Sequence, residues 1–212
     1  MDAAAAQIGP WLAIAGLGAY HGVNPAMGWL FAVALGLHRR SQGAVLVSLA
    51  PIALGHAGAV VAVVVAVAAF GVLIDPAVMR KAAGATLLAW AGWHALYGHR
   101  RRVRIGMQAG LAGLALWSFL MAGAHGAGLM LVPAVLPLCA GAATADGALA
   151  GPLTVATAAV AVHTAAMLAV IMAVSVVVFR WTGVGFLRRG WVNLDLVWSL
   201  ALALCGAVLL AA

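Results

Sequence analysis

The sequence predicts an all-α membrane protein in which six transmembrane helices form a 3+3 inverted repeat with kinked or broken helices. Two observations lead to this fold class. Apolar residues make up 67% of the 212 residues, which include only 11 basic and 4 acidic side chains. A pattern of histidine and tryptophan also recurs in the two halves. Because about 20 apolar residues cross a bilayer core as a helix, the whole chain, 1–212, is expected to be one transmembrane domain.

Six apolar stretches, separated by short charged clusters, are the expected spans. In chain order they are Gly9–Leu37, Gly43–Ile74, Ala82–Gly98, Ile105–Ala140, Ala148–Phe179 and Gly190–Ala212. The first, second, fourth and fifth contain roughly 30 residues, or about 45 Å of straight helix, whereas a bilayer core is about 30 Å thick. These four are expected to tilt, kink or break, and the shorter third and sixth spans are expected to act as scaffold.

Basic residues lie mainly in alternate loops. Nine of the eleven follow the first, third and fifth spans: Arg39, Arg40, Arg100, Arg101, Arg102, Arg104, Arg180, Arg188 and Arg189. The remaining loops hold Asp75, Arg80, Lys81 and Asp146. Because basic loops stay in the cytoplasm, we expect an integral protein of a bacterial-type cytoplasmic (inner) membrane with both termini outside. The positive charge then reflects topology, and nucleic acid is not an expected partner.

Histidine and tryptophan recur in the same order in the two halves of the chain. The first half holds His21, His56 and Trp90, and the second holds His125, His163 and Trp198, 104 to 108 residues later. Each unit contains three spans, an odd number, so the second unit enters the membrane from the opposite side. Units of about 9–98 and 105–212 are therefore expected to form an inverted repeat, which in transporters has its binding site near the midplane.

The four histidines of this pattern are the candidate site residues. An ionisable side chain within a span costs a few kcal/mol and normally faces the bundle interior or a water-filled path. Imidazole binds transition metals and also titrates near neutral pH. We therefore expect His21, His56, His125 and His163 to bind a nickel, cobalt, zinc or copper ion, with His21 and His125 also candidates for proton coupling. The alternative is hydrogen bonding between helices.

The stretch GAYHGVNPAMGW, Gly18 to Trp29, adds backbone and amide groups to this site. His21 and Asn24 are three residues apart and share a helical face. Pro25 has no N–H for the carbonyl of His21, so Asn24 and that carbonyl are predicted to join the site. Helix breaks are predicted at Pro25 and, in the second and fourth spans, at Pro51, Pro133 and Pro137, because broken helices free carbonyls for cations.

The remaining polar residues suggest fewer roles. Asp195 is the one acidic residue placed within a span, where it forms a salt bridge with a nearby arginine or takes part in proton coupling. Cys139 and Cys205 stand singly in apolar surroundings and are expected to be small buried side chains, with a soft-metal role as the alternative. The chain has no Walker loop, GxGxxG or HExxH motif, so nucleotide hydrolysis is not expected.

GAYHGVNPAMGW and LGHAGAVVAV resemble motifs of the lysine exporter superfamily of six-span transporters, in particular its nickel/cobalt efflux and nickel/cobalt permease branch. That branch has a first-span motif in which His, Pro and Gly lie together, and a later histidine that opens an apolar span. His21 and His56 occupy these positions here. The resemblance covers most of the chain with loose motifs and implies a six-helix transporter of metal ions.

The sequence thus predicts a secondary transporter that exports a divalent transition-metal ion through a histidine-lined midplane site with proton coupling. One alternative is export of an amino acid or small metabolite on the same fold. Another is an intramembrane histidine-ligated metal enzyme, which would need a catalytic acid or base from a chain without glutamate. A structural membrane subunit is a third. The lipid bilayer is the expected partner, and the ion, the direction and a homo-oligomeric state are left open.

Overall fold

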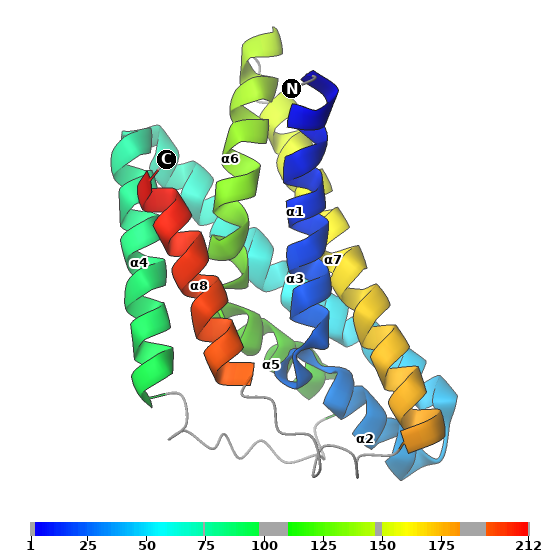
Figure 1. Cartoon of the computed structure of the whole chain (residues 1–212). Coiled ribbons are helices and arrows are strands. Elements are labelled where there is room, and N and C mark those ends of the chain that lie inside the picture. The colour runs from blue at the N-terminus through cyan, green and yellow to red at the C-terminus, as the bar shows by residue number, and fades with distance from the viewer. Residues whose placement is uncertain (1–2, 74, 98–109, 147–149, 183–193, 212) are drawn as a thin grey trace.

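The computed structural model describes residues 3–73, 75–97, 110–146, 150–182 and 194–211, and within them all regular structure is helical (Figure 1). The α-helices are α1 (Ala3–Val23), α2 (Trp29–Arg39), α3 (Gln42–Leu73), α4 (Pro76–Tyr97), α5 (Leu111–Ala124), α6 (Ala127–Asp146), α7 (Ala150–Val177) and α8 (Leu194–Ala211). A 3₁₀ turn, Pro25–Met27, connects α1 to α2, and a π-helical segment, Val178–Thr182, extends α7. The all-α class is confirmed.

Two helices of the described residues are long and apolar enough to cross a membrane. Their apolar segments are Gln42–Val67 in α3 and Gly151–Trp181 in α7 together with its extension. α5 and α6 are bent by 63° at the break between them, and together they add a third candidate if they form one span. By length and composition the described residues therefore contain two to three candidate membrane helices.

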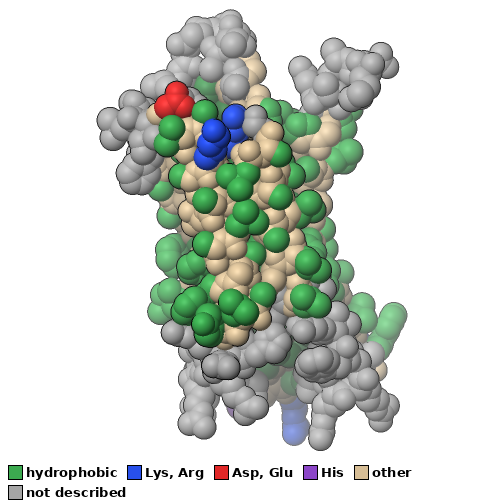
Figure 2. Space-filling model, turned by 60° about the vertical axis from the view of Figure 1, so that its left-hand side comes forward, with side chains coloured by type: hydrophobic (Ala, Val, Ile, Leu, Met, Phe, Trp, Pro, Cys, Tyr) green, Lys and Arg blue, Asp and Glu red, His purple; other side chains and the backbone are tan. Residues whose placement is uncertain are grey.

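The surface of the helical bundle is largely apolar between two charged ends. Leu12, Leu54 and Leu153 are 67%, 73% and 67% exposed. Figure 2 shows apolar side chains over the middle of one face, with lysine and arginine gathered near one end; the first turns of α4 carry Arg80 and Lys81. A lipid environment removes the cost of exposing such side chains to water.

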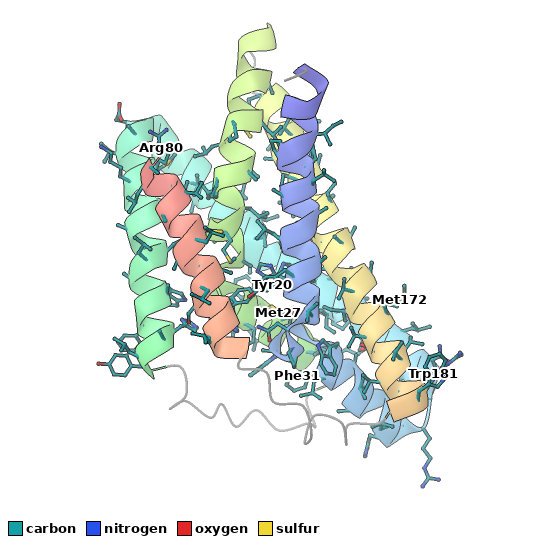
Figure 3. The ribbon with its side chains drawn as sticks, in the orientation of Figure 1. Tyr20, Met27, Phe31, Arg80, Met172 and Trp181 are labelled. Atoms are coloured by element: carbon teal, nitrogen blue, oxygen red, sulfur yellow. The ribbon has the colours of Figure 1, made fainter. Side chains whose placement is uncertain are left out.

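The helices pack in pairs that join distant parts of the chain; α1 and α7 run in the same direction, whereas α4 and α8 run in opposite directions. α1 lies along α7, α3 along α5, and α4 along α8. The start of α1 and the end of α8 lie at the same, upper end of Figure 1, and α2 lies at the opposite end. Figure 3 accordingly shows Arg80 and Trp181 at opposite ends of the bundle. At the α2 end, the Arg180 guanidinium donates two hydrogen bonds to Gln42 Oε1, at 3.0 and 2.7 Å.

The first apolar stretch is broken beside Pro25, as the sequence predicts. Asn24 begins the 3₁₀ turn, and its Oδ1 accepts a hydrogen bond from the Ala26 N–H at 2.9 Å. Gly28 then has φ +132°, which a residue with a side chain rarely adopts. A Cβ at this position would also lie 2.7 Å from Ile52 Cδ1. Glycine is therefore required where α2 begins.

The other three predicted breaks are wrong. Pro51 lies inside α3, and Pro133 and Pro137 lie inside α6. Each proline removes a single backbone hydrogen bond, which neighbouring groups in a membrane helix can replace. The fourth apolar stretch instead breaks at His125–Gly126, where Gly126 adopts a left-handed φ of +69°. The conformation of one glycine, rather than a proline, sets the second break.

Candidate histidine site

Three of the four predicted histidines meet in the interior of the bundle. His21 comes from the end of α1, His56 from the middle of α3 and His163 from α7, and all three are 0% exposed. The ring centroids are 4.9 Å apart for His21 and His163, 5.3 Å for His56 and His163, and 5.7 Å for His21 and His56. Residues 142 positions apart in sequence thus form one buried cluster, called here the inner cluster.

Hydrogen bonds define which ring nitrogens carry protons. His21 Nδ1 lies 2.7 Å from the Leu17 carbonyl and His163 Nδ1 lies 3.3 Å from the Ile14 carbonyl. A carbonyl only accepts, so both Nδ1 atoms donate and, in the neutral rings, both Nε2 atoms carry lone pairs. His56 Nε2 therefore donates to His163 Nε2, across 3.2 Å.

This proton arrangement leaves two buried lone pairs at the inner cluster. They belong to His21 Nε2 and His56 Nδ1, and neither atom has a hydrogen-bond partner among the described residues. A buried acceptor without a partner costs about 1–3 kcal/mol. The inner cluster is therefore not optimised for stability, and it offers electron pairs to a cation or to a hydrogen-bond donor.

The His56–His163 separation also fits metal ligation. Two imidazole nitrogens on one tetrahedral ion, each about 2.0–2.1 Å from it, lie about 3.3 Å apart. The two Nε2 atoms are 3.2 Å apart. In the present conformation, no set of three or more His, Cys, Asp or Glu side chains among the described residues is arranged to hold a metal ion. Full coordination would thus require His21 to move toward the other two rings.

The fourth histidine lies outside the inner cluster, which corrects the prediction that it completes the site. The indole of Trp198 lies edge-on to both His21 and His125, with centroid distances of 4.7 and 4.8 Å. Trp198 also stacks on Tyr20 at 5.4 Å, and its Nε1 donates to the His125 carbonyl at 3.1 Å. Figure 3 shows Tyr20 between α1 and α8. Trp198 therefore separates His125 from the inner cluster.

Asn24 and the His21 carbonyl also have other roles than the predicted ones. The His21 carbonyl accepts the Asn24 N–H at 3.2 Å, so Pro25 does not leave it without a partner. The Asn24 side chain caps the 3₁₀ turn through Ala26. Both groups stabilise the break that ends α1, and they position His21 rather than bind beside it.

Tryptophan N–H groups satisfy carbonyls at both breaks, a role that the sequence pattern did not predict. Four indole Nε1 atoms donate to these carbonyls: Trp29 to Val23 at 2.9 Å, Trp117 to Ala26 at 3.1 Å, Trp90 to Ala124 at 2.6 Å and Trp198 to His125 at 3.1 Å. The signal in the sequence was the recurring tryptophan of the third and sixth stretches. An indole is a donor only, so a buried tryptophan requires an acceptor such as these.

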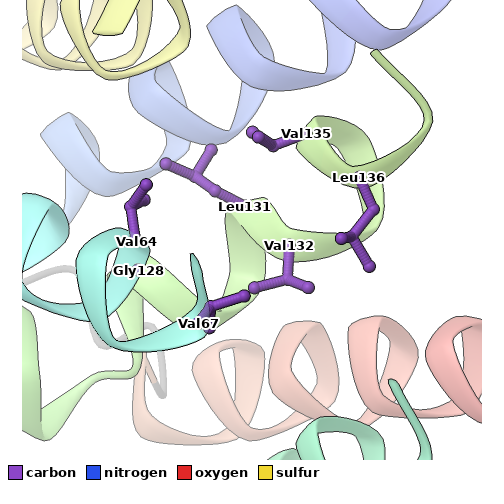
Figure 4. Close-up of a pocket in the computed structure, with 7 residues that line it drawn as sticks. All are labelled: Val64, Val67, Gly128, Leu131, Val132, Val135 and Leu136. Carbon is purple, nitrogen blue, oxygen red and sulfur yellow. The ribbon is translucent and has the colours of Figure 1, made fainter. Parts of the chain in front are cut away.

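The other candidates lie away from the inner cluster. Cys139 is half-buried, with Sγ 3.6 Å from the Pro152 carbonyl, and Cys205 is half-buried on α8. The backbone of Asp195 belongs to α8, but its side chain lies outside the described residues. A cavity of about 30 Å³ between α3 and α6 has only aliphatic and glycine lining (Figure 4). Because apolar cavities stay dry, this one offers no cation site.

No family model matches the chain, and neither the curated proteins nor the solved structures contain a match to it. The fold and the site therefore define its class: over the part of the chain that the structure describes, it is an all-helical protein with two to three candidate membrane helices and a buried cluster of three histidines.

Proposed function

We propose that this protein is a secondary membrane transporter that exports a divalent transition-metal ion by exchange with protons, and that His21, His56 and His163 bind the ion. One observation carries the proposal: three fully buried imidazoles from three apolar helices meet, with two Nε2 atoms 3.2 Å apart and two lone pairs without a partner. The resemblance to the lysine exporter superfamily, on His21 and His56, points the same way.

The proposed transporter has six spans in a 3+3 inverted repeat. Three features support an exchange of the two units about a pseudo-two-fold axis. α1 lies along α7 as α5 lies along α3. His21 and His125 each bring Nδ1 within 2.8 Å of the carbonyl four residues earlier. The corresponding residues His56 and His163 contact each other through the same atom, Nε2, as residues at such an axis do.

Ion binding follows from the protons of the inner cluster. His21 and His163 already carry the proton on Nδ1, and His56 carries it on Nε2. Moving the His56 proton to Nδ1 gives three neutral rings whose Nε2 atoms all present lone pairs. Because ligation needs neutral imidazole, protonation from an acidic compartment releases the ion there. The same nitrogens thus couple the two fluxes.

The proposed topology has both termini outside the cell and the arginine-rich end of α2 in the cytoplasm. We expect a membrane-impermeant maleimide, added to intact cells, to label Ala77→Cys at the start of α4 but not Ser41→Cys between α2 and α3. Both positions are exposed, and Cys139 and Cys205 are first replaced by serine. Labelling of Ser41→Cys alone would reverse the orientation.

Equilibrium metal binding tests the function. The purified protein is dialysed against nickel, cobalt, zinc and copper ions and analysed for bound metal. We expect a bound ion in the wild type and an affinity at least about tenfold lower in His163→Gln, because even the loss of a residue that only supports a ligand has effects of this size. Glutamine keeps a polar side chain of similar size, so that the substitution mainly removes the ligand nitrogen.

His38→Gln is the matched control for this experiment. His38 is an exposed histidine in the last turn of α2, and its replacement is expected to leave the affinity unchanged. Thermal unfolding of each variant is measured in parallel. If His163→Gln binds metal as tightly as the wild type, whatever its stability, the proposed metal site is wrong. The inner cluster is then a structural contact between helices.

A further inference from the structure

A second pair of histidines lies on the far side of Trp198 from the inner cluster. His94, in the last turn of α4, and His125, at the break between α5 and α6, have ring centroids 5.9 Å apart and planes inclined at 46°. Both side chains are half-buried, whereas the inner cluster is fully buried. The pair therefore lies between the surface and Trp198.

Both rings are anchored in the same way. His94 Nδ1 lies 3.3 Å from the Trp90 carbonyl, and His125 Nδ1 lies 2.8 Å from the Met121 carbonyl, four residues earlier in each case. Each Nδ1 therefore donates its proton to a carbonyl, and each neutral ring carries its lone pair on Nε2. Both rings thus have the tautomer that metal ligation through Nε2 requires.

Trp90 places the two rings relative to each other. Its indole packs against His94 with a centroid distance of 5.8 Å, and its Nε1 donates to the Ala124 carbonyl at 2.6 Å. Ala124 directly precedes His125, so this one side chain connects α4 to the break that carries the second histidine. The pair is therefore held by contacts between helices.

The separation of the rings fits a shared ion. With a metal–nitrogen distance of about 2.0–2.1 Å, a ring centroid lies about 3.2 Å from the ion, so two rings on one ion have centroids about 5–6.5 Å apart. The observed distance is 5.9 Å. We propose that His94 and His125 form an outer binding site for the divalent transition-metal ion. This inference rests on the proposed function, because it places the pair on the path that the transported ion takes to or from the inner cluster.

The outer site should bind more weakly than the inner cluster and exchange its ion faster. It offers two imidazoles rather than three, and its partial exposure leaves the remaining coordination positions to water. Trp198 contacts both His125 and His21, at 4.8 and 4.7 Å between centroids. An ion passing between the two sites must therefore pass this indole, which makes Trp198 the barrier between them.

Zinc titration of the purified full-length protein, read by competition with a chromogenic chelator, tests the outer site. The wild type is expected to bind one ion tightly and a second ion at least about tenfold more weakly, as expected where a ligand is missing. His94→Gln and His125→Gln should each remove the weak site and keep the tight one. His163→Gln should weaken the tight site, and His38→Gln should change neither.

The outcomes separate this inference from the proposed function. If His94→Gln and His125→Gln both retain two ions, the outer site does not exist, and the inner cluster is unaffected by that result. If His163→Gln keeps the tight site while the weak site is lost in His94→Gln, the outer pair is supported and the inner cluster loses its proposed role. A wild type that binds no zinc overturns both. Thermal unfolding of each variant is measured as well, so that loss of a binding site can be distinguished from loss of the folded structure.

Discussion

Replacing Gly18 by leucine is expected to lower the free energy of unfolding by about 3 kcal/mol, the upper range for overpacking a tight contact. A Cβ at Gly18 would collide with the backbone carbonyl of His163, and it would lie 3.1 Å from Ala166 Cβ. One turn later, a Cβ at Gly22 would lie 2.5 Å from the Met167 carbonyl. The Gly-x-x-x-Gly pattern thus lets α1 and α7 touch at the backbone. Thermal unfolding in detergent measures the loss.

Gly16→Leu is the matched control in the same helix. Gly16 is exposed, and a Cβ there would have no atom within 4 Å. Its replacement is expected to leave the free energy of unfolding unchanged or to raise it by up to about 1 kcal/mol, because leucine favours a helix more than glycine does. Equal losses in the two variants would mean that a leucine at either position on α1, rather than the contact with α7, decides the effect. In that case the backbone contact beneath the His21–His163 pair would not be needed for stability.

The sequence predicts the inner cluster better than its surroundings, for a physical reason. Ionisable side chains within apolar helices must face the interior of the bundle. Three histidines in such helices are therefore expected to lie in the same region. The position of His125 depends on Trp198, and no pattern in the sequence states that an indole will enter between two imidazoles. Composition restricts which residues avoid lipid, but packing decides which of them touch.

The helix breaks show the same contrast between features that local sequence predicts and features that packing decides. Asn24, Pro25 and Gly28 together predict a turn, because a cap, a missing N–H and a positive φ coincide within five residues. Pro133 and Pro137 have no such companions, and the helix continues through them. Gly126 is one of 26 glycines, so its left-handed conformation could not be singled out. A break is predictable where several local preferences agree.

Proteoliposomes with an acidic lumen, about pH 6 inside and 7.5 outside, are expected to accumulate zinc from the medium. Zinc binds the neutral rings, and the higher proton concentration of the lumen favours protonation of the same nitrogens over zinc binding on that side. Each proton exchanged per ion supports about 30-fold accumulation across this gradient. A fluorescent zinc indicator in the lumen measures the uptake, and a protonophore should abolish the accumulation.

The double variant His56→Gln/His163→Gln removes the two nitrogens that lie 3.2 Å apart, and its uptake is expected to fall to that of protein-free liposomes. His38→Gln, altered at an exposed histidine, should transport as the wild type does. Reversing the pH gradient should stop accumulation, because protonation on the outside then blocks binding. Zinc uptake by the double variant at the wild-type rate would contradict exchange through the inner cluster. So would uptake by the folded wild type that does not depend on the pH gradient. A slow uptake that requires the gradient but not these histidines would instead move the route to other helices.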